Sequence, residues 1–154
     1  MTTRKKPRPV IGWREFVDLP ELAGYPVKAK IDTGARTSAL HAFDLTLSEV
    51  AGVTTASFEI HPDQRSARHS EAVSCEVLTF RRVRSSNGKS ELRPVILTTA
   101  RIGKVEWPIE ISLTSRDDMG FRMLLGRSAI RKHFLVHPSR SFLLSSKPTK
   151  ESER

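Results

Sequence analysis

Apolar residues at alternating positions predict β-strands along most of this chain. Val27, Ala29 and Ile31 alternate with two lysines, which is the period of a strand that buries one face. Further segments are rich in β-branched and aromatic residues or are bounded by turn signals. We predict strands over residues 53–61, 72–83, 92–102 and 105–113. The pattern therefore indicates a protein built mainly from β-sheet.

Turn signals indicate how these strands connect. Asn87-Gly88 predicts a hairpin, because a type I′ turn needs positive φ at both central residues. Gly103 predicts a tight turn between two long strands. Residues 37–40 can continue as another strand. Short strands joined in this way are typical of an all-β barrel or sandwich.

The C-terminal third adds shorter elements. We predict a short strand over 123–125 that ends at Gly126, one or two helical turns over 127–133, and closing strands over 134–136 and 141–144. The fold class expected is therefore all-β with one short C-terminal helix.

The net charge of +9 is unevenly distributed. Residues 1–9 carry +4 and residues 145–154 carry +1, which leaves +4 for residues 10–144. We predict a basic disordered tail over 1–9, a folded domain over 10–144 and a disordered polar tail over 145–154. A body this mildly basic argues against nucleic acid as a partner and is compatible with an anionic substrate.

Other functional classes lack their sequence signals. One cysteine, Cys75, permits no internal disulfide and indicates a cytoplasmic setting. No apolar run approaches the ~18 residues of a membrane helix, so no membrane association is expected. Neither a phosphate-binding Gly-rich loop nor an H-E-x-x-H pair occurs. His133 and His137 lie where a strand and turn are expected, so we expect no metal and no cofactor.

The residues most suggestive of chemistry are Asp32, Thr33 and Gly34. A carboxylate here ends a predicted buried strand, and the glycine permits a sharp reversal of the backbone. Alone, this triplet fits an Asx-type turn between two strands. It equally fits a loop that presents Asp32 at the mouth of a barrel.

Three segments together resemble the retropepsin-like aspartic proteases. They are Gly12-Trp13-Arg14-Glu15, residues 28–41 (KAKIDTGARTSALH) and residues 123–127 (MLLGR). The similarity is greater still to a bacterial family of small proteins once labelled ATP-dependent zinc proteases. That family is associated with ATP-grasp ligases that add glutamates to ribosomal proteins. The resemblance covers residues 10–144 and implies a closed β-barrel.

The resemblance also implies roles for individual residues. Asp32 would pair with its copy in a homodimer, since aspartic peptidases use two carboxylates and this chain has one such triplet. Thr33 would lock the two loops together and Gly34 would leave backbone exposed to substrate. Ala35 offers no hydroxyl to stabilise the ionised carboxylate, which would leave the pair less acidic. Asp117-Asp118 is interpreted as a polar turn.

Substrate contacts are implied for Ala35, Arg36, Asn87, Gly88 and Arg127. Retroviral members carry an acid at the position of Arg36, where it pairs with the arginine equivalent to Arg127, so that ion pair cannot form here. Arg36 therefore either faces solvent, pairs with an acid such as Asp44, or binds a substrate carboxylate. The flap over the cleft would be the hairpin at Asn87-Gly88 or the polar loop over 63–70.

Two functions remain in competition, and a third, a metallopeptidase, is supported mainly by the older label of the family. The first is a homodimeric aspartic endopeptidase acting on acidic peptides, either glutamate-rich or glutamylated. A basic strip favours it, unless that strip is only a solvated hairpin face: Arg81, Arg82, Arg84, Lys89 and Arg93. The second is a non-catalytic basic β-barrel that binds the ribosome, RNA or an acidic protein.

Overall fold

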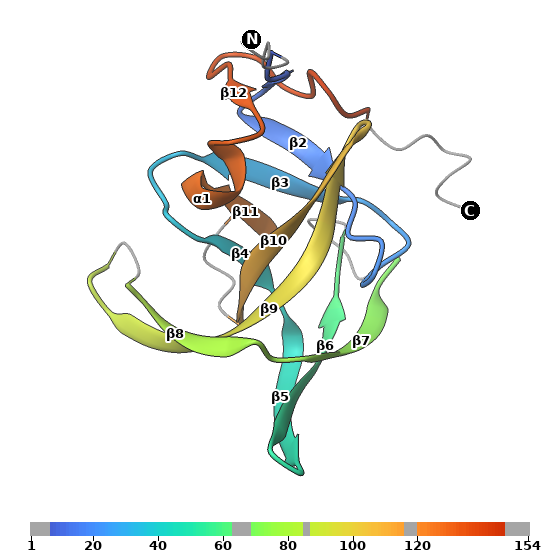
Figure 1. The fold of residues 1–154 in the computed structure, drawn as a ribbon, viewed down its shortest axis with the longest axis vertical. Helices are drawn as coiled ribbons and strands as arrows, with labels where there is room; N and C mark the ends of the chain where they lie inside the picture. The colour runs from blue at the N-terminus through green and yellow to red at the C-terminus, as the bar shows by residue number, and fades with distance from the viewer. Residues whose placement is uncertain (1–6, 63–68, 85–86, 116–119, 147–154) are drawn as a thin grey trace, which may run out of the picture.

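The computed structural model describes residues 7–62, 69–84, 87–115 and 120–146 (Figure 1). Within these ranges the chain forms twelve strands and one four-residue helix, α1 (Arg127–Ile130). The expected all-β fold with one short helix is confirmed, although the helix ends three residues before the predicted limit. No helix in the described ranges is long and apolar enough to cross a membrane.

Seven strands form the main sheet, in the order β2-β3-β11-β4-β10-β9-β8. They are β2 (Arg14–Val17), β3 (Val27–Asp32), β11 (Met123–Gly126), β4 (Ser38–His41), β10 (Val105–Thr114), β9 (Ser90–Ile102) and β8 (Thr79–Arg84). The alternation predicted for β3 is confirmed, because its first, third and fifth residues are buried. Ile31, Leu40, Ile111 and Leu125 form part of the apolar core behind the sheet.

Both predicted hairpins of this sheet are present. β8 and β9 pair antiparallel on either side of the Asn87-Gly88 turn, where Gly88 has φ +84°. β9 and β10 pair antiparallel around Gly103, whose φ is +60°. Glycine adopts such angles without steric cost, which explains its place at both turns.

The expected closed barrel forms only in part. The main sheet is an open series of strands, and Asp18, the residue after β2, meets Arg101 of β9 through one bridge. The two residues exchange backbone hydrogen bonds of 2.8 and 2.9 Å. The ring of strands is therefore joined at one point instead of along a continuous ladder.

Three further strands make a separate antiparallel sheet: β5 (Phe43–Val50), β6 (Val53–Ile60) and β7 (Glu71–Glu76). The β5–β6 hairpin turns at Ala51 and Gly52, both with positive φ, and extends away from the body of the protein (Figure 1). Sequence analysis assigned no strand to β5.

The single strand predicted over 72–83 is wrong, because the chain changes sheets at its middle. The N–H of Val77 donates to the carbonyl of Thr54 in β6, at 2.8 Å. The next N–H, of Leu78, donates to Val95 in β9, also at 2.8 Å. The segment is rich in β-branched and aromatic residues on both sides of this point, and Val77 and Leu78 are consecutive apolar residues, so it was interpreted as one strand.

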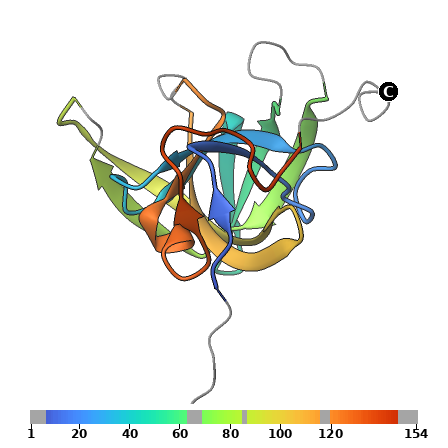
Figure 2. The same ribbon diagram turned by 90° about the horizontal axis from the view of Figure 1, so that it is seen from above.

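A third, two-stranded parallel sheet joins the ends of the domain. It pairs β1 (Val10–Ile11) with β12 (Leu135–Val136), and Figure 2 shows the blue N-terminal segment beside the orange C-terminal one. Pro9 also accepts a hydrogen bond from Leu135, at 3.0 Å. The folded part thus includes Pro9, which sequence analysis placed in the tail. Residues 1–6 and 147–154 of the two predicted tails lie outside the described residues.

A buried carboxylate fastens the C-terminal segment to the sheet. Glu15 has no exposed surface. Its oxygens accept hydrogen bonds from the N–H groups of Gly12 (2.7 Å), Leu143 (2.8 Å), Leu144 (3.3 Å) and Ser145 (2.9 Å), and from the Ser145 hydroxyl (2.6 Å). The predicted strand over 141–144 is therefore wrong, because a side chain takes the place of a partner strand. Ser145 belongs to the folded part.

Candidate active site

Asp32 ends β3 at the point where the chain turns sharply. One of its carboxylate oxygens, Oδ1, accepts hydrogen bonds from the N–H groups of Gly34 (3.1 Å) and Ala35 (3.2 Å). These bonds make the Asx-type turn that the sequence allowed. They also fix the direction of a carboxylate that is only half-buried. The two readings of the triplet are thus compatible, since the turn itself presents Asp32.

The strand behind this turn holds it through backbone contacts. Gly126, the last residue of β11, lies opposite Asp32 in the parallel pairing of β11 with β3. A Cβ at Gly126 would come within 2.5 Å of the Thr37 carbonyl carbon and oxygen, so only glycine fits. Its N–H donates to the Ser38 hydroxyl at 3.0 Å. The expected strand–glycine–helix segment is therefore packed directly against the loop.

Arg127 supports the loop instead of lining the cleft. Its N–H donates to the carbonyl of Ala35 (2.7 Å), and its guanidinium Nη1 donates to the carbonyl of Thr33 (3.1 Å). The residues lining the cleft do not include Arg127. Arg127 therefore holds the loop through these two hydrogen bonds, and the substrate contact implied for it stays a prediction. Thr33 and Gly34 are exposed at the tip of the turn.

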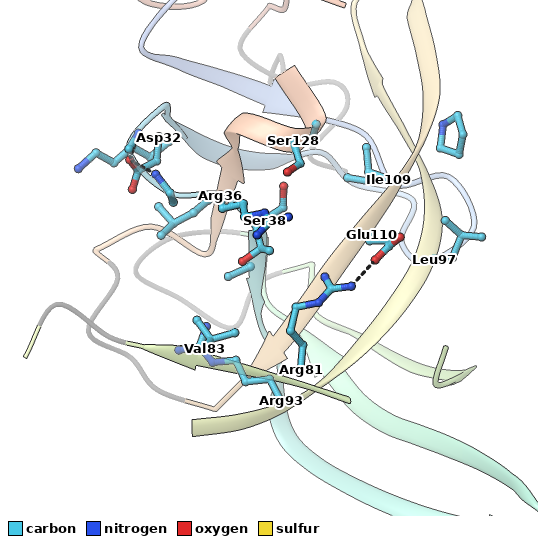
Figure 3. Close-up of a pocket in the computed structure, with 18 of the residues that line it drawn as sticks. Asp32, Arg36, Ser38, Arg81, Val83, Arg93, Leu97, Ile109, Glu110 and Ser128 are labelled. Atoms are coloured by element: carbon cyan, nitrogen blue, oxygen red, sulfur yellow. Dashed lines mark hydrogen bonds and ion pairs between the residues drawn. The ribbon is translucent and has the colours of Figure 1, made fainter. Parts of the chain in front are cut away.

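A cleft of about 1270 Å³ opens beside Asp32 (Figure 3). The loop residues Gly34, Ala35 and Arg36 line it. Its described lining contains six basic residues and two acidic ones. The basic residues are Lys30, Arg36, Arg81, Arg82, Arg84 and Arg93, and the acidic ones are Asp32 and Glu110. The cleft is therefore cationic around a single loop carboxylate.

Arg36 has no acidic partner among the described residues. Its side chain is exposed and lines the cleft, and no ion pair joins it to Asp44. Of the three alternatives considered, pairing with Asp44 is thus wrong. A guanidinium exposed in a cleft can bind a carboxylate through two parallel hydrogen bonds.

The hairpin contributes its strand instead of its tip. Asn87 and Gly88 do not line the cleft, whereas most of β8 does. Lys89, part of the predicted basic strip, is also outside the lining. Most of the alternative flap, residues 63–68, lies outside the described residues, as do Asp117 and Asp118.

The far end of the cleft was not predicted from the sequence. It is lined by Trp107, Ile109, Ala129 and His133. The Trp107 indole donates to the Ala129 carbonyl at 3.1 Å, and the His133 ring lies 5.5 Å from the indole. No local pattern marks these residues, because β10 meets α1 and the segment after it only in the folded chain. In the described part of the chain, no three His, Cys, Asp or Glu residues are grouped to hold a metal ion.

These features define a class of protein. The retropepsin-like fold is defined by three features that are all present here. They are an all-β fold, an Asp-Thr-Gly turn backed by an apolar strand that ends in glycine, and a cleft beside the aspartate. The chain belongs to the family described as "Retropepsin-like aspartic endopeptidase RimB", which matches residues 10–147. The resemblance inferred from the sequence is confirmed.

Several relatives are similar over most of this chain. A protein of Shewanella pealeana named "Probable alpha-L-glutamate ligase" is 41% identical over 94% of the chain but only 32% of its own length. A protein of Parasynechococcus marenigrum with the same name is 41% identical over 88% of the chain and 29% of its own length. The chain thus spans about a third of the curated relatives it matches. A crystal structure of a Legionella pneumophila protein of unknown function superposes with a TM-score of 0.71 at 26% identity, covering 88% of this chain and 98% of the other.

Proposed function

We propose that this chain is an aspartic endopeptidase that acts as a homodimer on acidic peptides, either glutamate-rich or glutamylated. The observation that carries the proposal is the position of Asp32. Its carboxylate is held by a backbone turn at the wall of a cleft whose other charged side chains are mostly basic.

The chemistry requires a second carboxylate. One carboxylate takes a proton from a water molecule while the other, protonated, donates a hydrogen bond to the peptide carbonyl. The water oxygen then bonds to the carbonyl carbon, the C–N bond breaks and the nitrogen leaves with a proton. Two carboxylates this close share one proton, because both cannot ionise together.

The second carboxylate is best supplied by another copy of the chain. Glu110 is the other acid lining the described cleft, but it is ion-paired with Arg81 at 2.9 Å, and Figure 3 shows it on the opposite side from Asp32. Thr33 and Gly34 are exposed next to Asp32, so the tip of the loop is open to a copy related by a two-fold axis.

The basic lining supports an acidic substrate. Arginine binds carboxylates with two hydrogen bonds, and its charge persists at every relevant pH. The relatives support glutamate in particular. This chain is similar to a segment that makes up about a third of the length of proteins named for ligation of L-glutamate. We propose that the ligase activity makes the type of peptide that this domain cleaves.

The test is cleavage of poly-glutamate and of a neutral peptide by the wild type, by Asp32→Asn and by Asp44→Asn. Asp44 is an exposed aspartate with positive φ, which asparagine tolerates, so its variant controls for loss of a carboxylate elsewhere. We expect Asp32→Asn to lose about 10²–10⁴-fold in rate, Asp44→Asn to match the wild type, and a chelator to have no effect. Equal cleavage by wild type and Asp32→Asn would refute the proposal.

Two further results separate the parts of the proposal. A dimeric site predicts that excess Asp32→Asn protein inhibits the wild type, since mixed dimers lack one carboxylate. A monomer that cleaves at full rate would contradict the homodimer. Binding to RNA or an acidic protein that weakens steeply with salt, without cleavage, would favour the non-catalytic alternative.

A further inference from the structure

Two arginines of the cleft lie directly opposite each other on neighbouring strands. Arg81 of β8 and Arg93 of β9 are register partners, and both line the cleft. Like charges placed opposite each other destabilise a sheet unless anions compensate them. Here each arginine has its own glutamate: Arg93 pairs with Glu91 at 2.9 Å, and Arg81 pairs with Glu110 at 2.9 Å.

The two ion pairs differ in their access to solvent. The side chain of Arg93 is 10% exposed and that of Glu91 29%, and Glu91 also accepts a hydrogen bond from Thr114 at 3.4 Å. That pair belongs to the framework of the sheet. The Arg81 and Glu110 side chains are 41% and 46% exposed, and both face the cleft.

The Arg81–Glu110 pair also spans the cleft wall. In the sheet, β9 lies between β8, which carries Arg81, and β10, which carries Glu110. Figure 3 shows the two side chains pointing toward each other. Exposed ion pairs of this kind are held weakly, because water competes for both charges. A carboxylate that enters the cleft can therefore exchange with Glu110 at the same guanidinium.

We propose that Glu110 occupies the place on Arg81 that a substrate carboxylate takes in the complex. An acidic peptide must therefore displace Glu110 from Arg81 in order to bind. This inference rests on the proposed function, because it assigns a specificity role within the same cleft. Without substrate, Glu110 offsets part of the positive charge of the facing arginines. In the complex, a peptide carboxylate offsets that charge instead. The displaced Glu110 then repels the acidic peptide, so the pair lowers affinity for acidic peptides in general.

The test measures binding separately from cleavage. Asp32→Asn protein is titrated with a fluorescein-labelled glutamate peptide and with a glutamine peptide of equal length, and the Kd is read from fluorescence anisotropy. Glu110→Gln should tighten binding of the glutamate peptide by about 1.5- to 5-fold, the range set by exposed ion pairs. Arg81→Gln should weaken it, and most of the gain from Glu110→Gln should vanish when Arg81 is also replaced. Binding of the glutamine peptide should not change.

Glu106→Gln is the matched control. Glu106 is also an exposed glutamate of β10 but does not line the cleft, so its replacement removes the same charge from the same strand. The proposal is overturned if Glu110→Gln leaves binding unchanged or weakens it, if Glu106→Gln tightens binding equally, or if the glutamate peptide does not bind. If binding follows these expectations but the wild type, which keeps Asp32, cleaves none of the peptides, the inference is supported and the peptidase is refuted.

Discussion

Replacing Glu15 tests whether one buried carboxylate fastens the end of the chain. In Glu15→Ala, five hydrogen-bond donors lose their acceptor at once. The Gly12 N–H is buried, so water cannot replace the lost oxygen there. The donors of residues 143–145 are partly exposed and recover part of their loss by binding water.

The size of the effect follows from this difference in burial. A hydrogen bond to a charged group contributes about 1.5–3 kcal/mol, and leaving a buried donor without a partner costs about 1–3 kcal/mol. One buried donor and several partly exposed ones therefore give a loss of about 3–5 kcal/mol in the free energy of unfolding. For a chain of this length, that loss lowers Tm by roughly 6–20 °C.

Thermal unfolding measures this loss directly, and amide hydrogen exchange shows where it acts. We expect the amides of Leu143 and Ser145 to lose protection in Glu15→Ala before the rest of the sheet does. Glu15→Gln should also be destabilised, because its NH₂ group would face N–H donors. Glu49→Gln, at an exposed site on β5, should stay within about 0.5 kcal/mol of the wild type. A Tm for Glu15→Ala within about 2 °C of the wild type would refute the reasoning.

Three further predictions concern the loop and the cysteine. Gly126→Ala should displace the Asp32 loop, since a Cβ would lie 2.5 Å from the Thr37 carbonyl; a variant with unchanged cleavage rate and Tm would contradict this. Arg127→Gln removes the guanidinium that holds the Thr33 carbonyl, so the cleavage rate should fall while Tm drops by only a few degrees, about 1 kcal/mol. Burial raises the pKa of the Cys75 thiol, so less thiolate forms at pH 8, and alkylation should be slower than for a free cysteine; an equal or faster rate would count against the burial.

Local pattern was sufficient for the elements that build the Asp32 loop. Strand alternation, the glycine after Asp32 and the apolar strand that ends at Gly126 are features of consecutive residues, and the structure confirms all three. They were also the residues that carried the family resemblance. The turns at Gly88 and Gly103 were predictable for the same reason, because the glycine that permits positive φ lies in the turn itself.

Features that depend on distant partners were not predictable. The change of sheet between Val77 and Leu78 depends on which carbonyl each N–H meets, and the two residues are equally apolar. Residues 141–144 were expected to form a strand, but Glu15 accepts the N–H groups of Leu143, Leu144 and Ser145. The pairing of Arg81 with Glu110 depends on the register of three strands, which periodicity does not specify.

The proposed dimer would contain the six basic residues of the described cleft lining twice. A two-fold axis near Asp32 would repeat the same arginines on both sides of the cut bond. The peptide would then meet matching charge before and after the point of cleavage, whichever way its chain runs. Such a site suits a uniform run of one acidic residue better than a sequence whose two halves differ.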